Sequence, residues 1–373
     1  MRKSEALNML TFREVPLYLI GAFFAGLFLS LLLIRLGRMR GVRFYVLDFP
    51  HDKSRKLHEK ATVRIGGLAL ILAIFLGEYF AQKISVFGLS SRVLVLLLFS
   101  LAVFLLGFCE DVTGRIGPKI RLLLISVVVY LALRVLDVSI IYIDFPLIDQ
   151  FLVTYPFLSA LFTIFAITGV TNAYNVVDGV NGLSASLSIA SIIPLSILAG
   201  AHGMVDLQHF GYIVAAATLG FLIVNALSGK IFLGDGGAYV LGSLVAMFCV
   251  LVIGESGGKV SPWLVILLNA YPITETCFSI IRRIIQSKSV DRPDSDHPHI
   301  LLHRFLKGKT ASIHSDVFEN SGAGVLILIP SVIFCLLGYC YRTQTEVLLL
   351  LYVLYVVLHT AAFFLLKITA PRC

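Results

Sequence analysis

The 373-residue chain has few charged residues, which make up only 14% of it. Soluble domains contain about 25% charged and about 45–50% apolar residues, whereas 58% of this chain is hydrophobic and its mean hydropathy is +0.92. A soluble globular enzyme is therefore excluded. Long apolar runs recur along the whole length, so the sequence predicts one all-α domain, residues 1–373, built as a polytopic transmembrane helix bundle.

Several sequence signatures are absent as well. The six cysteines show neither CxxC nor Cys/His spacing, so no disulfide framework and no zinc site is indicated. The chain has no GxxxxGK[ST] and no HExxH pattern, which argues against nucleotide hydrolysis as a power source. The first apolar run, Val15 to Leu36, has no AxA-like cleavage site, so we expect it to span the membrane rather than to be cleaved as a signal peptide.

Eleven apolar runs approach the roughly 20 residues that cross a hydrocarbon core of about 30 Å. The predicted spans are 15–36, 66–82, 91–109, 120–136, 156–175, 183–200, 210–228, 236–254, 262–281, 324–341 and 346–366. The connections 35–65, 110–121, 172–183, 225–238 and 282–323, with the carboxyl tail, hold 22 of the 30 Lys and Arg residues. Positive residues mark the cytoplasm. We therefore expect the amino terminus outside and the carboxyl terminus in the cytoplasm.

The same five connections hold the polar residues that could do chemistry. The net charge of +8 thus reports orientation, and nucleic acid is not an expected partner. These residues are His51, His58, Glu110, Asp111, Asn172, Asn175, Asp178, Asn181, Asn225, Asp235, His297, His299 and His303. They predict a chemical site at the cytoplasmic face.

Four polar residues repeat every third position in the run NAYNVVDGVNGL, namely Asn172, Asn175, Asp178 and Asn181. While the chain stays helical they share one slowly drifting face, which could bind a ligand. The alternative is a helix end capped by Asn and Asp, although a cap needs only one such residue.

Asp235 lies at a helix start in the run IFLGDGGAYVLG. A helix amino terminus attracts anions, the glycines leave room for a phosphate, and a carboxylate binds Mg²⁺. The alternative is that Asp235 is a simple N-cap.

Glu110 and Asp111 are adjacent carboxylates at the end of an apolar helix, where they are costly unless they are hydrated, paired or bound to a metal. Lys119 and Arg121 follow and would draw this pair toward an anionic substrate. The alternative is a hydrated surface pair.

The run DRPDSDHPHILLHR places His299 and His303 at the spacing of one helical face. Imidazoles suit Zn²⁺ better than Mg²⁺. The nearby basic residues Arg282, Arg283, Arg304 and Lys307 favour diphosphate binding over a metal site. A hydrated polar loop is the alternative.

Two further features face the cytoplasm or the membrane. Residues 35–65 carry nine Lys and Arg and would attract anionic lipid headgroups. Glu275 lies inside the ninth predicted span, where an ionisable group is functional or paired. We expect an Arg at the inner side as its partner.

Together, NAYNVVDGVNGL, IFLGDGGAYVLG, the Glu110-Asp111 pair, HEKATVRIGG and HPHILLHR resemble the polyprenyl-phosphate N-acetylhexosamine-1-phosphate transferases over residues 50–310. The resemblance implies that a UDP-amino sugar meets undecaprenyl phosphate at the cytoplasmic face of a bacterial inner membrane. Sugar-1-phosphate then passes to the lipid and UMP is released. The resemblance also implies Mg²⁺ as the cofactor, with Mn²⁺ as a substitute, and a homodimer.

The resemblance assigns roles residue by residue. Asp235 would bind the metal. Asp111 with Glu110 would deprotonate or orient the lipid phosphate, supported by Lys119. The diphosphate would contact His297 and His299.

The nucleotide pocket follows from the same resemblance. Asp178 and Asn175 would lie in it near the metal, and Asn225 and Phe232 would contact and stack on uracil. The other residues expected to bind substrate are Asn172, Asn181 and Arg304.

The sequence departs from the family pattern at two positions. Glu110 replaces the first Asp of an Asp-Asp pair, and Asn181 replaces the second Asp of DGxDG. The span count and the late histidine loop favour the branch that initiates O-antigen or related envelope glycans.

Two other functions are compatible with polar clusters in a membrane protein. A transporter or flippase of a nucleotide sugar or lipid-linked sugar could use them as a gate, although transporters place such sites near mid-membrane. A scaffold derived from an inactivated enzyme is the third hypothesis, and the retained Asp111, Asp178 and Asp235 argue against it.

Overall fold

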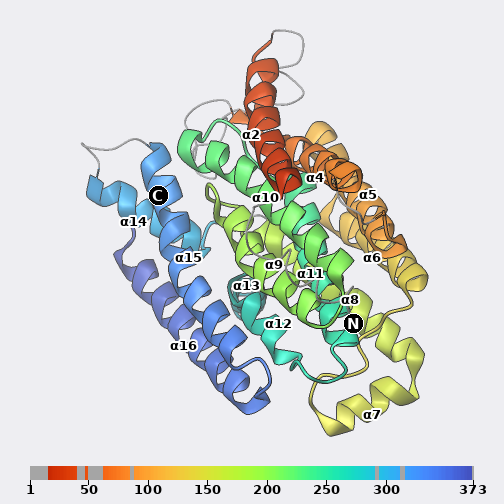
Figure 1. The fold of residues 1–373 in the computed structure, drawn as a ribbon. Helices are drawn as coiled ribbons and strands as arrows, with labels where there is room; N and C mark the ends of the chain where they lie inside the picture. Colours follow the sequence, from red (N-terminus) through yellow and green to blue (C-terminus); the bar gives the residue numbers. More distant parts are fainter. Residues whose placement is uncertain are drawn as a thin grey trace.

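The computed structural model describes residues 16–39, 47–48, 62–84, 88–289, 294–310 and 316–371. Across these ranges the chain is almost wholly helical, which confirms the all-α prediction (Figure 1). The long helices are α2 (Leu17–Gly37), α4 (Gly66–Ile84), α5 (Ser91–Thr113), α6 (Pro118–Leu136), α8 (Pro156–Val176), α9 (Leu183–Ala201), α10 (Val205–Ser228), α11 (Gly234–Glu255), α15 (Asp316–Cys340) and α16 (Thr345–Thr369). The shorter ones are α7 (Pro146–Thr154), α12 (Trp263–Leu268), α13 (Ala270–Ile285) and α14 (Pro298–Thr310).

Nine helices in the described part of the chain are long and apolar enough to cross a membrane. They match nine of the predicted spans. The predicted span 120–136 corresponds to α6, which is 19 residues long but carries Lys119, Arg121 and Arg134. The total of eleven spans and the side of each terminus stay predictions.

The ninth predicted span is two helices rather than one, and together they cover nearly all of the predicted range. The helix is interrupted at Asn269, between α12 and α13. Pro272 has no N–H to donate to the carbonyl of Leu268 and cannot continue a helix across it. That carbonyl instead accepts hydrogen bonds from Ser191 Oγ at 2.8 Å and from Cys335 Sγ at 3.4 Å. Asn269 Nδ2 donates to the Val265 carbonyl at 2.9 Å.

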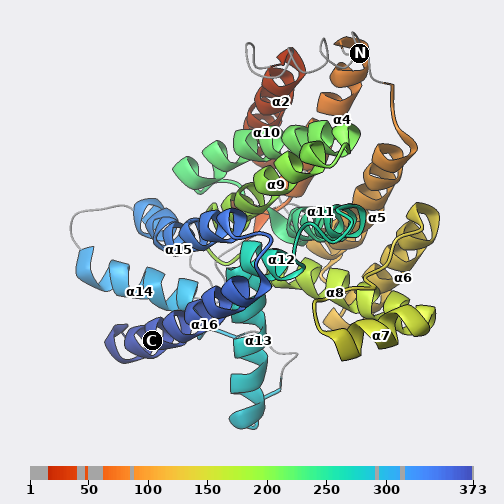
Figure 2. The same cartoon turned by 60° about the horizontal axis from the view of Figure 1, so that its bottom comes forward.

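Helix α11 forms the centre of the bundle. Of its most apolar 18-residue window, 94% is buried inside the protein. It packs against α4, α5, α8 and α9, and Figure 2 looks nearly along its axis, with α5, α8 and α9 around it. An all-round apolar helix is expected in such a position, because no face of it meets water or polar headgroups.

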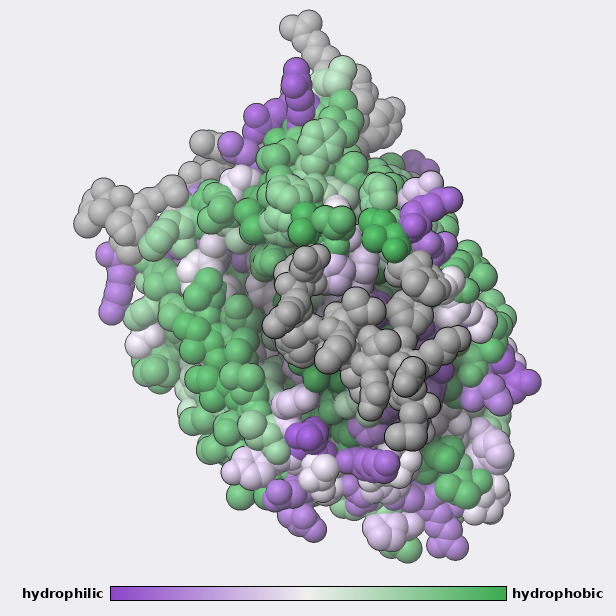
Figure 3. All heavy atoms as spheres, viewed as in Figure 1, coloured by the Kyte–Doolittle hydropathy of each residue, from purple (hydrophilic) through white to green (hydrophobic). Residues whose placement is uncertain are grey.

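The outer helices expose apolar side chains instead. Leu350, Leu358 and Ile368 of α16 are all exposed, and Figure 3 shows apolar residues over much of the visible face. This surface suits contact with lipid acyl chains. The five cysteines in the described ranges are free.

The predicted site segments meet at one end of α11. Strand β2 (Thr62–Val63) pairs antiparallel with β1 (Leu47–Asp48) and forms a parallel bridge between Val63 and Ile231. Phe232 donates its N–H to the Val63 carbonyl at 2.6 Å. The segment before α4 is thereby held beside the segment that leads into α11.

Candidate functional site

Asp111 caps helix α11 from a neighbouring helix. The first N–H groups of a helix have no partner within it. Asp111, buried on α5, accepts the N–H of Asp235 on Oδ1 and the N–H of Gly236 on Oδ2, each at 3.0 Å. Asp235 itself makes no capping bond, and the N-cap residue is Leu233. The simple-cap alternative for Asp235 is therefore wrong.

The Asp235 carboxylate points to two other helices. Oδ1 accepts a hydrogen bond from Asn175 Nδ2 of α8 at 2.9 Å. Oδ2 forms an ion pair with Arg121 of α6. Three predicted connections, 110–121, 172–183 and 225–238, thus converge on one carboxylate.

Glycines allow this convergence. A Cβ on Gly107 would lie 2.5 Å from the Gly236 Cα, and a Cβ on Gly67 would lie 2.4 Å from the Gly237 nitrogen. Gly234 has φ +74° and contacts the Arg64 carbonyl. Helices α4 and α5 therefore approach the start of α11 more closely than side chains would permit.

Asp178 completes what we call the carboxylate cluster, Asp111, Asp178 and Asp235. Helix α8 ends at Val176, so Asn172 and Asn175 lie on the helix but Asp178 and Asn181 lie in the following turn. The prediction of one shared helical face is thus correct only for Asn172 and Asn175. Burial, reinforced by repulsion from Asp111, raises the pKa of Asp178 to about 8.

His299 packs against the turn that holds Asp178. A Cβ on Gly179 would lie 2.4 Å from His299 Nε2. His299 is fully buried, and its Nδ1 shares a 2.9 Å hydrogen bond with the Tyr271 hydroxyl. Burial, with repulsion from His297, lowers the pKa of His299 to about 3, so the ring is neutral at physiological pH.

Glu275 binds two histidines, and the predicted Arg partner was wrong. Its Oε1 lies 2.6 Å from His297 Nδ1 and its Oε2 lies 2.9 Å from His359 Nε2. The His297 and His299 rings stack, with centroids 5.3 Å apart. We call Glu275, His297 and His359 the histidine network. It pairs a fully buried carboxylate with two imidazoles, as burial of a charge requires.

Asn225 and Asn181 form hydrogen bonds that hold the turn after α8. Asn225 Oδ1 accepts the Gly182 N–H and its Nδ2 donates to the Ile231 carbonyl, both at 2.6 Å. The Asn181 N–H donates to Asn320 Oδ1 of α15 at 2.6 Å. The uracil contact expected of Asn225 stays a prediction.

The remaining predicted site residues are Glu110, Lys119, Asn172, Phe232 and Arg304. Glu110 separates from Asp111, because its Oε2 accepts the Ile116 N–H at 2.7 Å. Lys119 is exposed near the start of α6, and Asn172 and Phe232 are half-buried. Arg304 is half-buried on α14 and forms no ion pair with the carboxylate cluster in the described part of the chain.

Some functional partners carried no usable signal in the sequence. Tyr271, His359 and Asn320 lie far along the chain from His299, Glu275 and Asn181, and no motif links each pair. His51, His58 and most of the 35–65 connection, including part of HEKATVRIGG, lie outside the described residues.

The cluster offers donors that fit Mg²⁺. Its carboxylates supply oxygen, which is the ligand atom that Mg²⁺ prefers. The Arg121 guanidinium balances the charge of Asp235, so this carboxylate already binds a positively charged group. Asp235 would hold the metal, and Asp178, which lies near enough to Asp111 to be repelled by it, is a further candidate ligand.

Comparisons of the sequence with known proteins find related transferases. Residues 93–253 match the profile described as "Glycosyl transferase family 4". A "Probable undecaprenyl-phosphate N-acetylglucosaminyl 1-phosphate transferase" of Bacillus subtilis (strain 168) is 26% identical over 301 residues, 78% of this chain and 79% of that protein.

Two other relatives have related descriptions. An "Undecaprenyl-phosphate alpha-N-acetylglucosaminyl 1-phosphate transferase" of Haemophilus influenzae is 30% identical over 293 residues, 75% of this chain and 77% of that protein. A "Phospho-N-acetylmuramoyl-pentapeptide-transferase" of Shouchella clausii is 30% identical over 212 residues, 54% of this chain and 64% of that protein.

Proposed function

Since this chain belongs to the polyprenyl-phosphate N-acetylhexosamine-1-phosphate transferase family, we propose that it transfers N-acetylglucosamine 1-phosphate from UDP-GlcNAc to undecaprenyl phosphate. The first two relatives described above act on this sugar and this lipid by their names, which supports the choice of both. The reaction would open an envelope glycan pathway, such as O-antigen or teichoic acid synthesis. The site would face the cytoplasm of a bacterial inner membrane, where the basic connections are predicted to lie.

The observation that carries the proposal is the meeting of Asp111, Asp235, Asn175 and Arg121 at the amino terminus of α11. A helix amino terminus and an arginine attract phosphate, while carboxylates beside them bind a divalent cation. A diphosphate carrying Mg²⁺ suits this combination of charges. Phosphoryl transfer needs such positioning and charge neutralisation more than covalent chemistry by the protein.

The proposed reaction is a single displacement. An oxygen of undecaprenyl phosphate attacks the sugar-linked β-phosphorus of UDP-GlcNAc and forms a new P–O–P bond. The bond from this phosphorus to the oxygen it shares with the α-phosphorus breaks, and UMP leaves with the electron pair. Mg²⁺, when bound, would neutralise the charge on the diphosphate.

The chain's own residues would position the two substrates. Asp111 is fixed by two backbone N–H groups, so it can orient the lipid phosphate without moving. Arg121 would pass from Asp235 to a phosphate oxygen, because guanidinium groups bind both kinds of oxyanion. His297 is held by Glu275 with one ring nitrogen left to reach the diphosphate.

The test is UMP release by the purified protein in detergent, supplied with undecaprenyl phosphate, Mg²⁺ and a panel of UDP-amino sugars. We expect UMP only when lipid, metal and UDP-GlcNAc are all present. Release with a different amino sugar would correct the donor. No UMP with any donor, from protein shown to be folded, would contradict the transferase and favour the transporter.

A further inference from the structure

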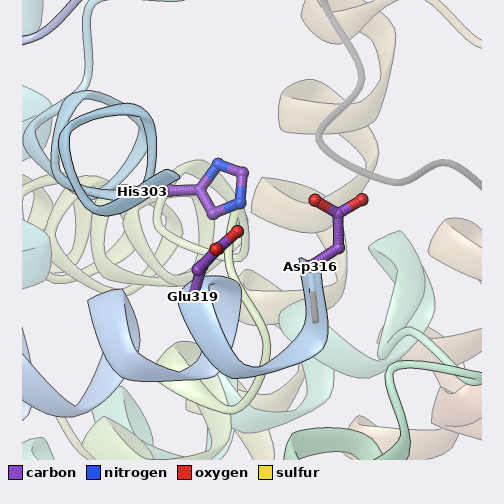
Figure 4. A group of neighbouring side chains, drawn as sticks. All are labelled: His303, Asp316 and Glu319. Atoms are coloured by element: carbon purple, nitrogen blue, oxygen red, sulfur yellow. The ribbon is translucent and has the colours of Figure 1, made fainter. Parts of the chain in front are cut away.

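A second group of potential metal ligands lies outside the carboxylate cluster. His303 of α14 and Asp316 and Glu319 of α15 each offer one ligand atom, and these atoms all lie within 4.8 Å of one another. Figure 4 shows the His303 ring and both carboxylates directed toward a shared space between the two helices. Asp316 and Glu319 are three residues apart on the first turn of α15, which places them on one face.

The buried His303 ring lacks a partner among the described residues. His303 is 2% exposed, and Glu319 beside it is 4% exposed. Neither ring nitrogen of His303 has a hydrogen-bond partner in the described part of the chain, and neither does Asp316 Oδ2. An unsatisfied buried polar atom is costly, and an ordinary helix start with acidic residues would leave its carboxylates in water.

One cation already lies at the edge of the group. Lys307 Nζ contacts Asp316 Oδ1 at 2.7 Å, which leaves Oδ2 for another ligand. A cation bound between the helices would give Asp316 Oδ2 and a His303 ring nitrogen the partner that they lack among the described residues.

We propose that His303, Asp316 and Glu319 bind a divalent transition-metal ion, with Zn²⁺ preferred, that ties α14 to α15. One imidazole nitrogen and two carboxylate oxygens match the ligand types of zinc, and imidazole disfavours Mg²⁺ and Ca²⁺. Around a tetrahedral Zn²⁺ with bonds of about 2.0–2.2 Å the ligand atoms lie roughly 3.5 Å apart. The ligand atoms, which lie within 4.8 Å of one another, therefore need to close by no more than about 1.3 Å on binding.

The proposed ion would have a structural role, because it would lie between α14 and α15. Helix α14 carries His299, which packs beneath Gly179. Helix α15 carries Asn320, which accepts the Asn181 N–H. Each helix thus supports the turn that holds Asp178, and an ion between them would fix both supports together.

The test measures metal content rather than activity. The full-length protein is purified in detergent without an oligohistidine tag, dialysed against a chelator, and given limiting Zn²⁺. We expect a single tight equivalent of zinc by mass spectrometry and a higher thermal unfolding midpoint with Zn²⁺ than with the same concentration of Mg²⁺.

The variants separate this site from the proposed magnesium site. Asp316→Asn keeps the side-chain shape and should weaken zinc binding more than about 100-fold, because loss of a direct ligand exceeds the 10–100-fold effect of supporting residues. Glu319→Gln should do the same. Asp235→Asn and the matched histidine control His202→Gln should keep the zinc equivalent, since the His202 ring bonds to the Leu198 carbonyl of its own helix end.

The proposal is overturned if the wild type retains no zinc and shows no Zn²⁺-dependent shift of its unfolding midpoint. It is equally overturned if the Asp316 and Glu319 variants bind zinc as tightly as the wild type, or if Mg²⁺ competes with Zn²⁺ at equal concentration. Should one variant fail to fold, the other decides the outcome.

Discussion

The N–H of Asp235 donates a 3.0 Å hydrogen bond to Oδ1 of Asp111, although the two residues lie 124 positions apart in the chain. This bond fixes the start of α11 against the end of α5. The two carboxylates have different partners, because Asp111 accepts hydrogen bonds from backbone N–H groups while Asp235 contacts the side chains of Asn175 and Arg121. Substitutions at the two positions should therefore have different effects.

Asp235→Asn should lower the rate of UMP release at least about 100-fold, as for loss of a major electrostatic contact to the reacting phosphates. The fold should be retained, since the amide has the same shape. The matched control is Asp137→Asn, because Asp137 is exposed and its φ of +52° suits Asn. Full activity of Asp235→Asn would refute the metal assignment.

Asp111→Asn should lower turnover strongly while leaving most UDP-sugar binding intact. The amide accepts only one of the two N–H groups at the start of α11, so we also expect a loss of about 1–2 kcal/mol in stability. Isothermal titration with UDP-GlcNAc, run beside the turnover assay, checks this. Lost binding with normal turnover of the bound fraction would reverse the role.

His359 should act as a positioning residue through Glu275. His359→Leu removes the donor to Glu275 Oε2, whereas His359→Gln can place an amide N–H near the former Nε2. We expect kcat to fall about tenfold in the Leu variant, a modest loss of alignment, with KM for UDP-GlcNAc little changed, and the Gln variant to recover most of it. Equal loss in both variants would indicate a packing role instead.

Gly179→Ala should disturb His299, because the new Cβ would lie 2.4 Å from His299 Nε2. Overpacking of this kind costs about 1–3 kcal/mol, and thermal unfolding in detergent measures it. Gly169→Ala is the control, since a Cβ there meets nothing within 4 Å and α8 gains a better helix former. If both variants unfold at the same temperature, the close approach is not tight in solution.

The contribution of His299 to the stability of the protein should fall as the pH is lowered below about 6.5, while the raised pKa of Asp178 contributes in the opposite direction. The pKa of His299 drops from 6.5 to about 3 on folding because of burial, so the unfolded chain binds a proton that the folded chain does not. Between these two values each pH unit costs up to about 1.4 kcal/mol from this group. His299→Asn, which offers Tyr271 a polar atom near the Nδ1 position, should remove this contribution, so the unfolding free energy of the variant relative to the wild type should rise as the pH is lowered. An unchanged slope would contradict the assignment.

The sequence alone was sufficient for the class of protein and for the membership of the carboxylate cluster. Apolar runs of membrane length dictate helices, because lipid offers no partner for unpaired backbone groups. The motifs around Asp111, Asp178 and Asp235 then indicated the chemistry. The sequence did not reveal the break at Asn269, where Pro272 and two distant donors to Leu268 decide the outcome.

What the sequence determined and what only the structure decided differ in how far apart along the chain the interacting residues lie. Local composition and spacing determined which segments are helical, which helices suit lipid and which residue types cluster at helix ends, because these depend on neighbours within a few turns. Only the tertiary structure decided the pairings of Asp111 with α11, Glu275 with His297 and His359, and Asp235 with Arg121. Such contacts join segments that the chain keeps far apart, and helix packing alone brings them within hydrogen-bonding distance.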